Sequence, residues 1–399
     1  MLIKSVLILK FKSGCCRQYP GKANNFINEM REMKESALIF CENQFGLVDG
    51  KTAVGLIRQS EIYNIVGVID SRLEGKDAGE VLGMRKVHIP IFKSLESALH
   101  KLTKTPNYLI YGKAPAEPCL PGNERLIVID AMKRGMGIVN GLHQIFSEDT
   151  EFSKIAKEEK VKIIDIRKPP EVKDLHIYSG KGSIVDVPVV AVLGTDCASG
   201  KRTTAVALNK SLNNLGVKSV LVGTGQTSLM QGSKYGVAID AIPSQFAIGE
   251  VEHAVYSAFC EESPDIIIVE GQGAASHEAF LSSIAIIRGC HPDGIILQHS
   301  PAREKRCDFP FLFVPSVESE ISLLNNLSRV DVIALTLNSE NFSKSQMKKI
   351  KIQYEENFKI STSDILVDGC DNLIKALTTK FKTIYDKVNK PVKLSLVTP

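Results

Sequence analysis

Apolar residues in this 399-residue chain fall into short runs that alternate with segments of helical spacing. The runs at 37–41, 64–70 and 108–111 predict buried strands, and the spacing at 94–104 and 123–133 predicts helices. Strands that alternate with helices pack as a parallel sheet covered by those helices. The pattern therefore predicts an α/β fold with a mainly parallel sheet in the first half of the chain.

The second half of the chain repeats this alternation. Helical spacing at 201–215 and 246–260 separates short apolar runs. These runs predict strands at 219–222, 294–298 and 332–337. The Lys-rich tail from residue 340 onward also has helical spacing, and we expect it to be a solvated face. Each half of the chain thus predicts an α/β unit of its own.

A glycine-rich turn joins a predicted strand to a predicted helix at residues 189–205. Small residues let backbone N–H groups approach phosphate oxygens, and the helix N-terminus favours an anion. Lys201, which we expect to be exposed, would add a mobile positive charge. The stretch predicts a phosphate-binding P-loop. Its binding residues are Gly194, Thr195, Asp196, Cys197, Ala198, Ser199, Gly200, Lys201, Arg202, Thr203 and Thr204.

The loop departs from the usual P-loop pattern at two positions. Gly194 lies one position early, and Arg202 stands where a Ser or Thr hydroxyl would hold Mg²⁺. The early glycine resembles the loop of dethiobiotin synthetase, which reads G-T-D-T-x-x-G-K-T. Arg202 adds positive charge in place of a metal ligand, which favours phosphate binding over Mg²⁺-dependent hydrolysis.

An acidic residue ends another apolar run, at 264–273. In P-loop folds a strand near the loop ends in a carboxylate that positions Mg²⁺ or its water. Glu270 is the candidate for that role. The sequence at 269–273, V-E-G-Q-G, is similar to a V-E-G-x-G run of dethiobiotin synthetase.

The chain divides at a segment without apolar periodicity, residues 168–182, which contains two prolines and two glycines. The part before this segment is Rossmann-like, although no G-x-G-x-x-G follows its strands, so a tightly bound dinucleotide is not indicated. The predicted units are a basic N-terminal extension at 1–34, a Rossmann-like domain at 35–167, a linker at 168–182 and a P-loop NTPase-like domain at 183–399.

Composition narrows the classes of partner. An apolar content of 44% supports two cores, and an evenly spread net charge of +4 argues against nucleic acid or an anionic membrane. No apolar run approaches the length of about 18 residues needed to span a membrane. The nine cysteines form no Cys-x-x-Cys pair and follow no secretory leader, which fits reduced thiols in a cytoplasmic protein. We assign no metal ligand.

The first thirty residues are basic, with no acid before Glu29. An organelle-targeting segment is acid-poor in this way, but it is normally rich in Arg and Ser and amphipathic. Residues 1–10 fit a short strand or an extension better, so targeting remains the alternative.

Several of these stretches together carry a family resemblance. The chain resembles the D-glutamate N-acetyltransferase family, long described only as a domain of unknown function, over roughly residues 35–385. The matching stretches are 194–197 with 200–203, 224–227, 236–240, 269–273 and Ser276-His277, with weaker matches at 51–53 and 141–143. The resemblance implies a Rossmann-like N-terminal part, a P-loop C-terminal part and an arginine after the P-loop lysine, as here.

The resemblance also implies an activity, acetyl transfer from acetyl-CoA to the amino group of an amino acid such as D-glutamate. This chemistry needs a site for the phosphates of coenzyme A and a base for the amine, but no bound metal. The base must lie within hydrogen-bond reach of the substrate. His277, Glu270 and Asp240 are the candidates.

Four further residues are candidate substrate contacts. Gln226 and Thr227 lie on a predicted loop after the strand at 219–222. Asp70 and Arg72 lie just beyond the carboxyl end of a predicted strand, where open α/β sheets bind ligands. A solvated loop pair explains Asp70 and Arg72 equally well.

Two other classes of function compete with acetyl transfer. In an ATP-dependent ligase or kinase resembling dethiobiotin synthetase, Lys201 would clamp the γ-phosphate, Thr203 would bind Mg²⁺ and Glu270 would order the metal. In a regulatory protein the P-loop would only sense a nucleotide. The sequence leaves open the acceptor amine, its stereochemistry, ATP against coenzyme A, and the oligomeric state, a homo-oligomer included.

Overall fold

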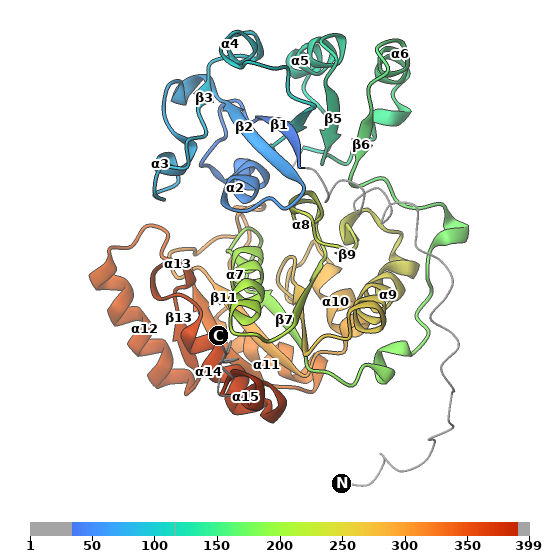
Figure 1. Cartoon of the computed structure of the whole chain (residues 1–399). Coiled ribbons are helices and arrows are strands. Elements are labelled where there is room, and N and C mark those ends of the chain that lie inside the picture. Colours follow the sequence, from blue (N-terminus) through green and yellow to red (C-terminus); the bar gives the residue numbers. More distant parts are fainter. Residues whose placement is uncertain (1–33, 116, 390–399) are drawn as a thin grey trace, which may run out of the picture.

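The structure, a computed structural model, describes residues 34–115 and 117–389. It consists of two α/β domains that lie one above the other in Figure 1. Every pair of neighbouring strands in the two sheets runs parallel. The predicted fold class is therefore confirmed. The expectations for the segment 1–33 lie outside the described residues.

The N-terminal domain contains a six-stranded sheet. In sheet order the strands are β3 (Ile91–Phe92), β2 (Tyr63–Ile69), β1 (Glu35–Phe40), β4 (Tyr108–Tyr111), β5 (Gly137–Asn140) and β6 (Ile163–Asp165). Its helices are α2 (Lys51–Arg58), α3 (Ala78–Val81), α4 (Leu95–Lys101), α5 (Gly122–Lys133) and α6 (Thr150–Glu158). Helices α2 and α3 pack on one face of the sheet, and α4, α5 and α6 pack on the other.

The C-terminal domain contains a seven-stranded sheet. In sheet order the strands are β13 (Ser361–Ser363), β12 (Val332–Leu337), β11 (Gly294–His299), β7 (Val189–Gly194), β10 (Ile266–Glu270), β8 (Ser219–Gly223) and β9 (Tyr235–Gly236). The helices are α7 (Lys201–Asn214), α8 (Gln226–Gln231), α9 (Ser244–Glu262), α10 (Ser282–Cys290), α11 (Val317–Ser328), α12 (Lys344–Phe358), α13 (Ile365–Asp368), α14 (Asp371–Lys380) and α15 (Lys382–Val388). After β7 the chain adds β8 and β9 on one side and then inserts β10 between β7 and β8. It next crosses to the other side of β7 and adds β11, β12 and β13, so the switch point lies beside β7.

The tail beyond residue 340 differs from its expectation. Helix α12 is largely solvated, as predicted, and buries only Met347 fully. Strand β13 then adds an edge to the sheet, and α14 and α15 bury Leu373, Leu377 and Ile384 in the core. The Lys-rich composition of the tail concealed these apolar positions.

The segment between the sheets contains no strand. It leaves β6 after Asp165 and reaches β7 at Val189, with two short 3-10 helices on the way. The backbone N–H groups of His176 and Ser179 donate to Glu250 and Glu252 of α9, at 2.6 and 2.7 Å. The connection is therefore fixed along the C-terminal domain by two buried carboxylates.

Polar contacts join the two domains directly. Arg202 Nη2 of α7 donates to the carbonyl of Lys51 at 3.1 Å, and the hydroxyls of Thr52 and Thr227 lie 2.9 Å apart. Helix α8 adds Gln231, whose Nε2 donates to the carbonyls of Gly55 and Gln59, and Met230, which joins the N-terminal core. Helix α2 is thus the main contact of the upper domain with the lower one.

No helix in the described parts of the chain is long and apolar enough to cross a membrane.

Substitution of Gly55 tests the interface between the domains. A Cβ atom at this position would lie 2.9 Å from both Arg202 Nη2 and Thr227 Cγ2. We expect Gly55→Ala to lower the free energy of unfolding by about 1–3 kcal/mol, the usual cost of overpacking, in urea titrations. Gly122→Ala is the control, because nothing lies within 4 Å of its Cβ position. Equal stability of the two variants would contradict the close packing of α2.

Candidate functional site

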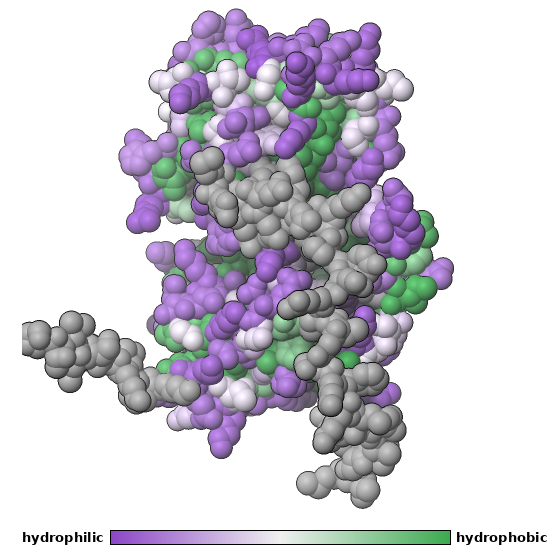
Figure 2. Space-filling model, turned by 45° about the vertical axis from the view of Figure 1, so that its right-hand side comes forward, coloured by the Kyte–Doolittle hydropathy of each residue, from purple (hydrophilic) through white to green (hydrophobic). Residues whose placement is uncertain are grey.

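A cavity of about 1180 Å³ lies between the two domains. Its walls come from residues that follow the carboxyl ends of strands in both sheets: β4 and β5 above, and β7, β8 and β10 below. Open α/β sheets bind their ligands at this edge, next to the switch point. A recess between the two domains is visible on the surface in Figure 2.

The P-loop forms the part of the cavity wall that follows β7. Gly200 adopts a φ of +116° and Ala198 a φ of +46°, a left-handed turn that suits an anion-binding loop. Helix α7 begins at Lys201 without a side-chain cap, so its first N–H groups face the loop. Residues 197–204 line the cavity, whereas Gly194, Thr195 and Asp196 lie behind it.

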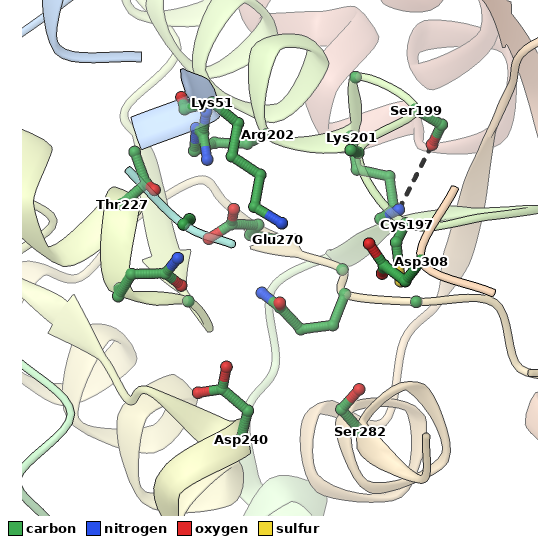
Figure 3. A pocket seen from close by; sticks show the side chains of 18 of the residues that line it. Lys51, Cys197, Ser199, Lys201, Arg202, Thr227, Asp240, Glu270, Ser282 and Asp308 are labelled. Carbon is green, nitrogen blue, oxygen red and sulfur yellow. Dashed lines mark hydrogen bonds between the residues drawn. The ribbon is translucent and has the colours of Figure 1, made fainter. Parts of the chain in front are cut away.

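The side chain of Lys201 is buried, so the expectation of an exposed lysine is wrong. Lys201 is only 5% exposed, because the aliphatic part of its side chain packs beside Gly194. The amine Nζ donates to the carbonyl of Asp196. It also donates to Ser199 Oγ at 3.3 Å, the bond drawn in Figure 3. Burial lowers the pKa of Lys201. The lysine therefore uses oxygen acceptors of its own loop.

Arg202 extends away from the P-loop toward the N-terminal domain. Its guanidinium lines the cavity and donates to the carbonyl of Lys51. Burial lowers the pKa of Arg202, and the nearby carboxylate of Glu270 opposes that shift. The hydroxyl of Thr204 is also engaged, because it donates to Gln298 Oε1 at 2.6 Å.

Glu270 lies at the end of β10, next to the P-loop strand. It pairs in register with Val192 of β7 and is 4% exposed. Its Oε2 accepts from the backbone N–H of Thr224 at 3.1 Å. Burial raises the pKa of Glu270, although the charge of Arg202 opposes the shift. In the view of Figure 3, Glu270 lies between the Arg202 and Lys201 sides of the cavity.

Gln226, Thr227 and Asp240 also line the cavity. Gln226 and Thr227 begin helix α8, so the predicted loop is a short helix. Asp240 is held by Arg167, whose Nη2 and Nε lie 2.6 and 3.1 Å from its Oδ2. The carboxylate of Asp240 is therefore already neutralised by a cation.

His277 lies next to the P-loop but outside the cavity lining. Its Nδ1 accepts from the backbone N–H of Ala279 at 3.1 Å, and burial lowers its pKa. The neutral ring therefore carries its proton on Nε2, an atom without a hydrogen-bond partner among the described residues. This arrangement leaves the ring without a free lone pair for accepting a proton.

His277, Asp196 and Cys197 together are the group in the described residues with ligand atoms close enough for a metal, within 4.8 Å of one another. Two cations lie beside it: Arg303 Nη1 is 3.4 Å from Asp196 Oδ2, and Arg306 Nη1 is 4.0 Å from Oδ1. Two guanidinium charges and a histidine without a free lone pair disfavour a bound cation.

Asp70 and Arg72 are not brought together with the P-loop. They form an ion pair of 2.8 Å, and Asp70 Oδ2 also accepts from the backbone N–H of Phe45 at 3.0 Å. Neither residue is part of the cavity lining. The pair instead fixes the loop that precedes α2.

Two arginines that the sequence analysis did not select hold the P-loop through its carbonyl groups. Arg303 donates to the carbonyls of Cys197 and Ala198 at 2.9 and 3.2 Å, and Arg306 donates to that of Thr195 at 3.3 Å. Their position directly after a predicted strand, in a run of charged residues, was an available signal. These contacts occupy the loop carbonyls, which leaves the N–H groups to face a ligand.

Lys51 and Arg58 of the N-terminal domain were also not selected, although both line the cavity. They lie on α2, a helix that the sequence analysis did not predict, and no local pattern indicates that it faces the other domain.

A P-loop between β7 and α7, with a buried acid at the end of the adjacent strand, makes this a two-domain protein of the P-loop α/β class. The chain belongs to the DUF1611 family. A family model described as a DUF1611_C P-loop domain of unknown function matches residues 176–374, and one described as a DUF1611_N Rossmann-like domain matches residues 71–169.

Similar proteins agree with this assignment. A Pseudoalteromonas protein named D-glutamate N-acetyltransferase is 30% identical over 63% of this chain and 75% of its own length. A Tritonibacter scottomollicae protein of the same name is 25% identical over 85% of this chain and 97% of its own. A crystal structure of a DUF1611 family protein from Anabaena variabilis has a TM-score of 0.80 and 28% identity, covering 87% of this chain and 100% of that one.

The pH dependence of stability tests the buried state of Glu270. Because its pKa is raised on folding, its ionisation costs no stability below the ordinary pKa of glutamate, and the cost grows as the pH rises toward the folded pKa. We expect Glu270→Gln to have a higher melting temperature than the parent at pH 8, and this gain to vanish near pH 4. The exposed Glu356→Gln is the control. A Glu270→Gln variant that melts below the parent at pH 8 contradicts this electrostatic balance.

Proposed function

We propose that this protein is an N-acetyltransferase that moves the acetyl group of acetyl-CoA to the amino group of an amino acid such as D-glutamate. The name of the two relatives, at 25 and 30% identity, supports an acetyl transfer. The observation that carries the proposal is the position of Arg202. This arginine occupies the metal-ligand position of the P-loop and donates a hydrogen bond to the carbonyl of Lys51 in α2. A phosphate cradle without the metal-binding hydroxyl suits anchoring of a donor rather than phosphoryl transfer.

The P-loop is the proposed site for the phosphates of acetyl-CoA. The N-terminus of α7, the left-handed turn of the loop and the amine of Lys201 supply positive charge there. The cavity, at about 1180 Å³, exceeds the usual range of about 300–1,000 Å³ for ligand sites. It therefore has room for a donor and an acceptor together.

Glu270 is the proposed general base. It lines the cavity, and a carboxylate with a raised pKa is better matched to the proton of an ammonium group than an ordinary one. Once Glu270 takes that proton, the amine nitrogen attacks the thioester carbonyl. The C–N bond forms, the C–S bond breaks and the coenzyme A thiolate takes up a proton. Asp240, paired with Arg167, and His277, without a free lone pair, are less suited to this step.

Activity with a panel of amino acids tests the proposal. We expect release of free thiol from acetyl-CoA with an amino acid acceptor, together with a product heavier by one acetyl group. Glu270→Gln should lower kcat about 10²- to 10⁴-fold, the usual contribution of a general base, and leave acetyl-CoA affinity nearly unchanged. Thermal stabilisation by ATP–Mg²⁺ but not by acetyl-CoA would favour the ligase or regulatory alternative instead.

Removal of the loop lysine tests the binding site separately. Lys201→Ala should weaken acetyl-CoA binding by about 2 kcal/mol, or about thirtyfold, because one charge-assisted contact with phosphate is lost. Calorimetry measures this change. Lys210→Ala, at an exposed position of the same helix, is the matched control. Equal affinity of the two variants for acetyl-CoA contradicts phosphate binding at this loop.

A further inference from the structure

Helix α2 presents two cations to the cavity from the N-terminal domain. Lys51, Val54 and Arg58 follow one another at positions i, i+3 and i+7, and all three line the cavity. The opposite side of the helix, including Leu56 and Ile57, is buried in the N-terminal core. In Figure 3 the side chain of Lys51 extends into the cavity.

These two cations have no ionic partner among the described residues. The described ion pairs include neither Lys51 nor Arg58, and the Nε atom of Arg58 is buried without a hydrogen bond. Burial lowers the pKa of Arg58. Arg58 is partly buried, and its Nε has lost its hydration without gaining an acceptor, which is costly.

A third cation increases this imbalance. Arg202 lies close enough to Arg58 for the two charges to repel each other, and both line the cavity. The carboxylate beside them is that of Glu270, while Asp240 and Glu340 are paired with Arg167 and Arg303 elsewhere in the lining. Glu117, Asp308 and Asp364 complete the carboxylates of the lining, and Glu270 is the one whose charge acts on Arg202. The group of Lys51, Arg58 and Arg202 therefore suits an anion.

We propose that Lys51 and Arg58, with Arg202, form a subsite for the carboxylate of the acceptor amino acid. The subsite rests on the proposed function, because Glu270 beside it is the proposed base and an α-amino group is one carbon from its carboxylate. The fork of a guanidinium binds a carboxylate through two parallel hydrogen bonds. The N-terminal domain thereby selects the acceptor, and an acidic amino acid offers a second carboxylate to the same cations.

The position of the subsite favours a carboxylate over a phosphate of coenzyme A. The P-loop supplies its own anion site at the N-terminus of α7. Lys51 and Arg58 instead come from α2, a helix of the other domain, and lie about 10 Å apart along its axis. The acceptor carboxylates and the donor phosphates then occupy opposite sides of Glu270.

Kinetics of variants test the subsite. Arg58→Gln and Lys51→Gln should each raise the KM for the acceptor by about tenfold to a hundredfold, the worth of one charge-assisted hydrogen bond. Acetyl-CoA affinity, measured by calorimetry without an acceptor, should stay within about twofold. Arg58→Lys keeps the charge and should recover part of the loss, and it also serves if Arg58→Gln folds poorly. Arg134→Gln, an exposed arginine of the same domain outside the cavity lining, is the control.

Calorimetry with glutarate, a dicarboxylate without an amine, separates this proposal from acetyl transfer. Binding of glutarate to the parent and its loss in Arg58→Gln support the subsite even if no amine is acetylated. Unchanged acceptor KM and unchanged glutarate affinity in an active Arg58→Gln enzyme overturn it and leave acetyl transfer intact. Weaker acetyl-CoA binding with an unchanged acceptor KM also overturns it, by assigning the cations to a phosphate of the donor.

Discussion

The hydrogen bond from Arg202 to the carbonyl of Lys51 connects the start of α7 to helix α2 of the other domain, and the cavity lies where these two helices meet. Arg202 directly follows the P-loop lysine, and Lys51 begins the helix that forms the opposite wall of the cavity. One contact therefore connects the phosphate loop to the N-terminal domain. The charge of Arg202 also lies beside the buried carboxylate of Glu270, where it opposes the rise in the pKa of Glu270 that burial causes.

Around this contact the charges are arranged in two groups. Arg303 and Arg306 bind carbonyls of the P-loop and are paired with Glu340 and Glu278, so they fix the loop while their own charges are balanced. Lys51 and Arg58, which also line the cavity, have no such ionic partner among the described residues. A rigid loop backed by satisfied charges, facing a cavity with unsatisfied ones, is a preorganised site for anions.

The sequence predicted elements whose signals are local, and missed features that depend on contacts between distant residues. The strands 108–111 and 332–337 were predicted at their observed bounds, because a buried strand in a parallel sheet is a continuous apolar run. Strands β3, β9 and β13 are two or three residues long and carry no periodicity. The burial of Lys201 and the role of α2 were missed for another reason, since both follow from how loops and domains pack on one another.

The polar contacts between α2 and α8 limit how ligands can enter and leave the cavity. The threonine pair and the hydrogen bond from Gln231 to Gly55 are buried, and the one to Gln59 is partly buried, so separating the domains would break several of these bonds at once. A large hinge motion is therefore an expensive way to admit a substrate. Ligands are expected to pass through the open side of the cavity while the domains stay together, so that release of a bound ligand depends on loops at the rim rather than on domain opening.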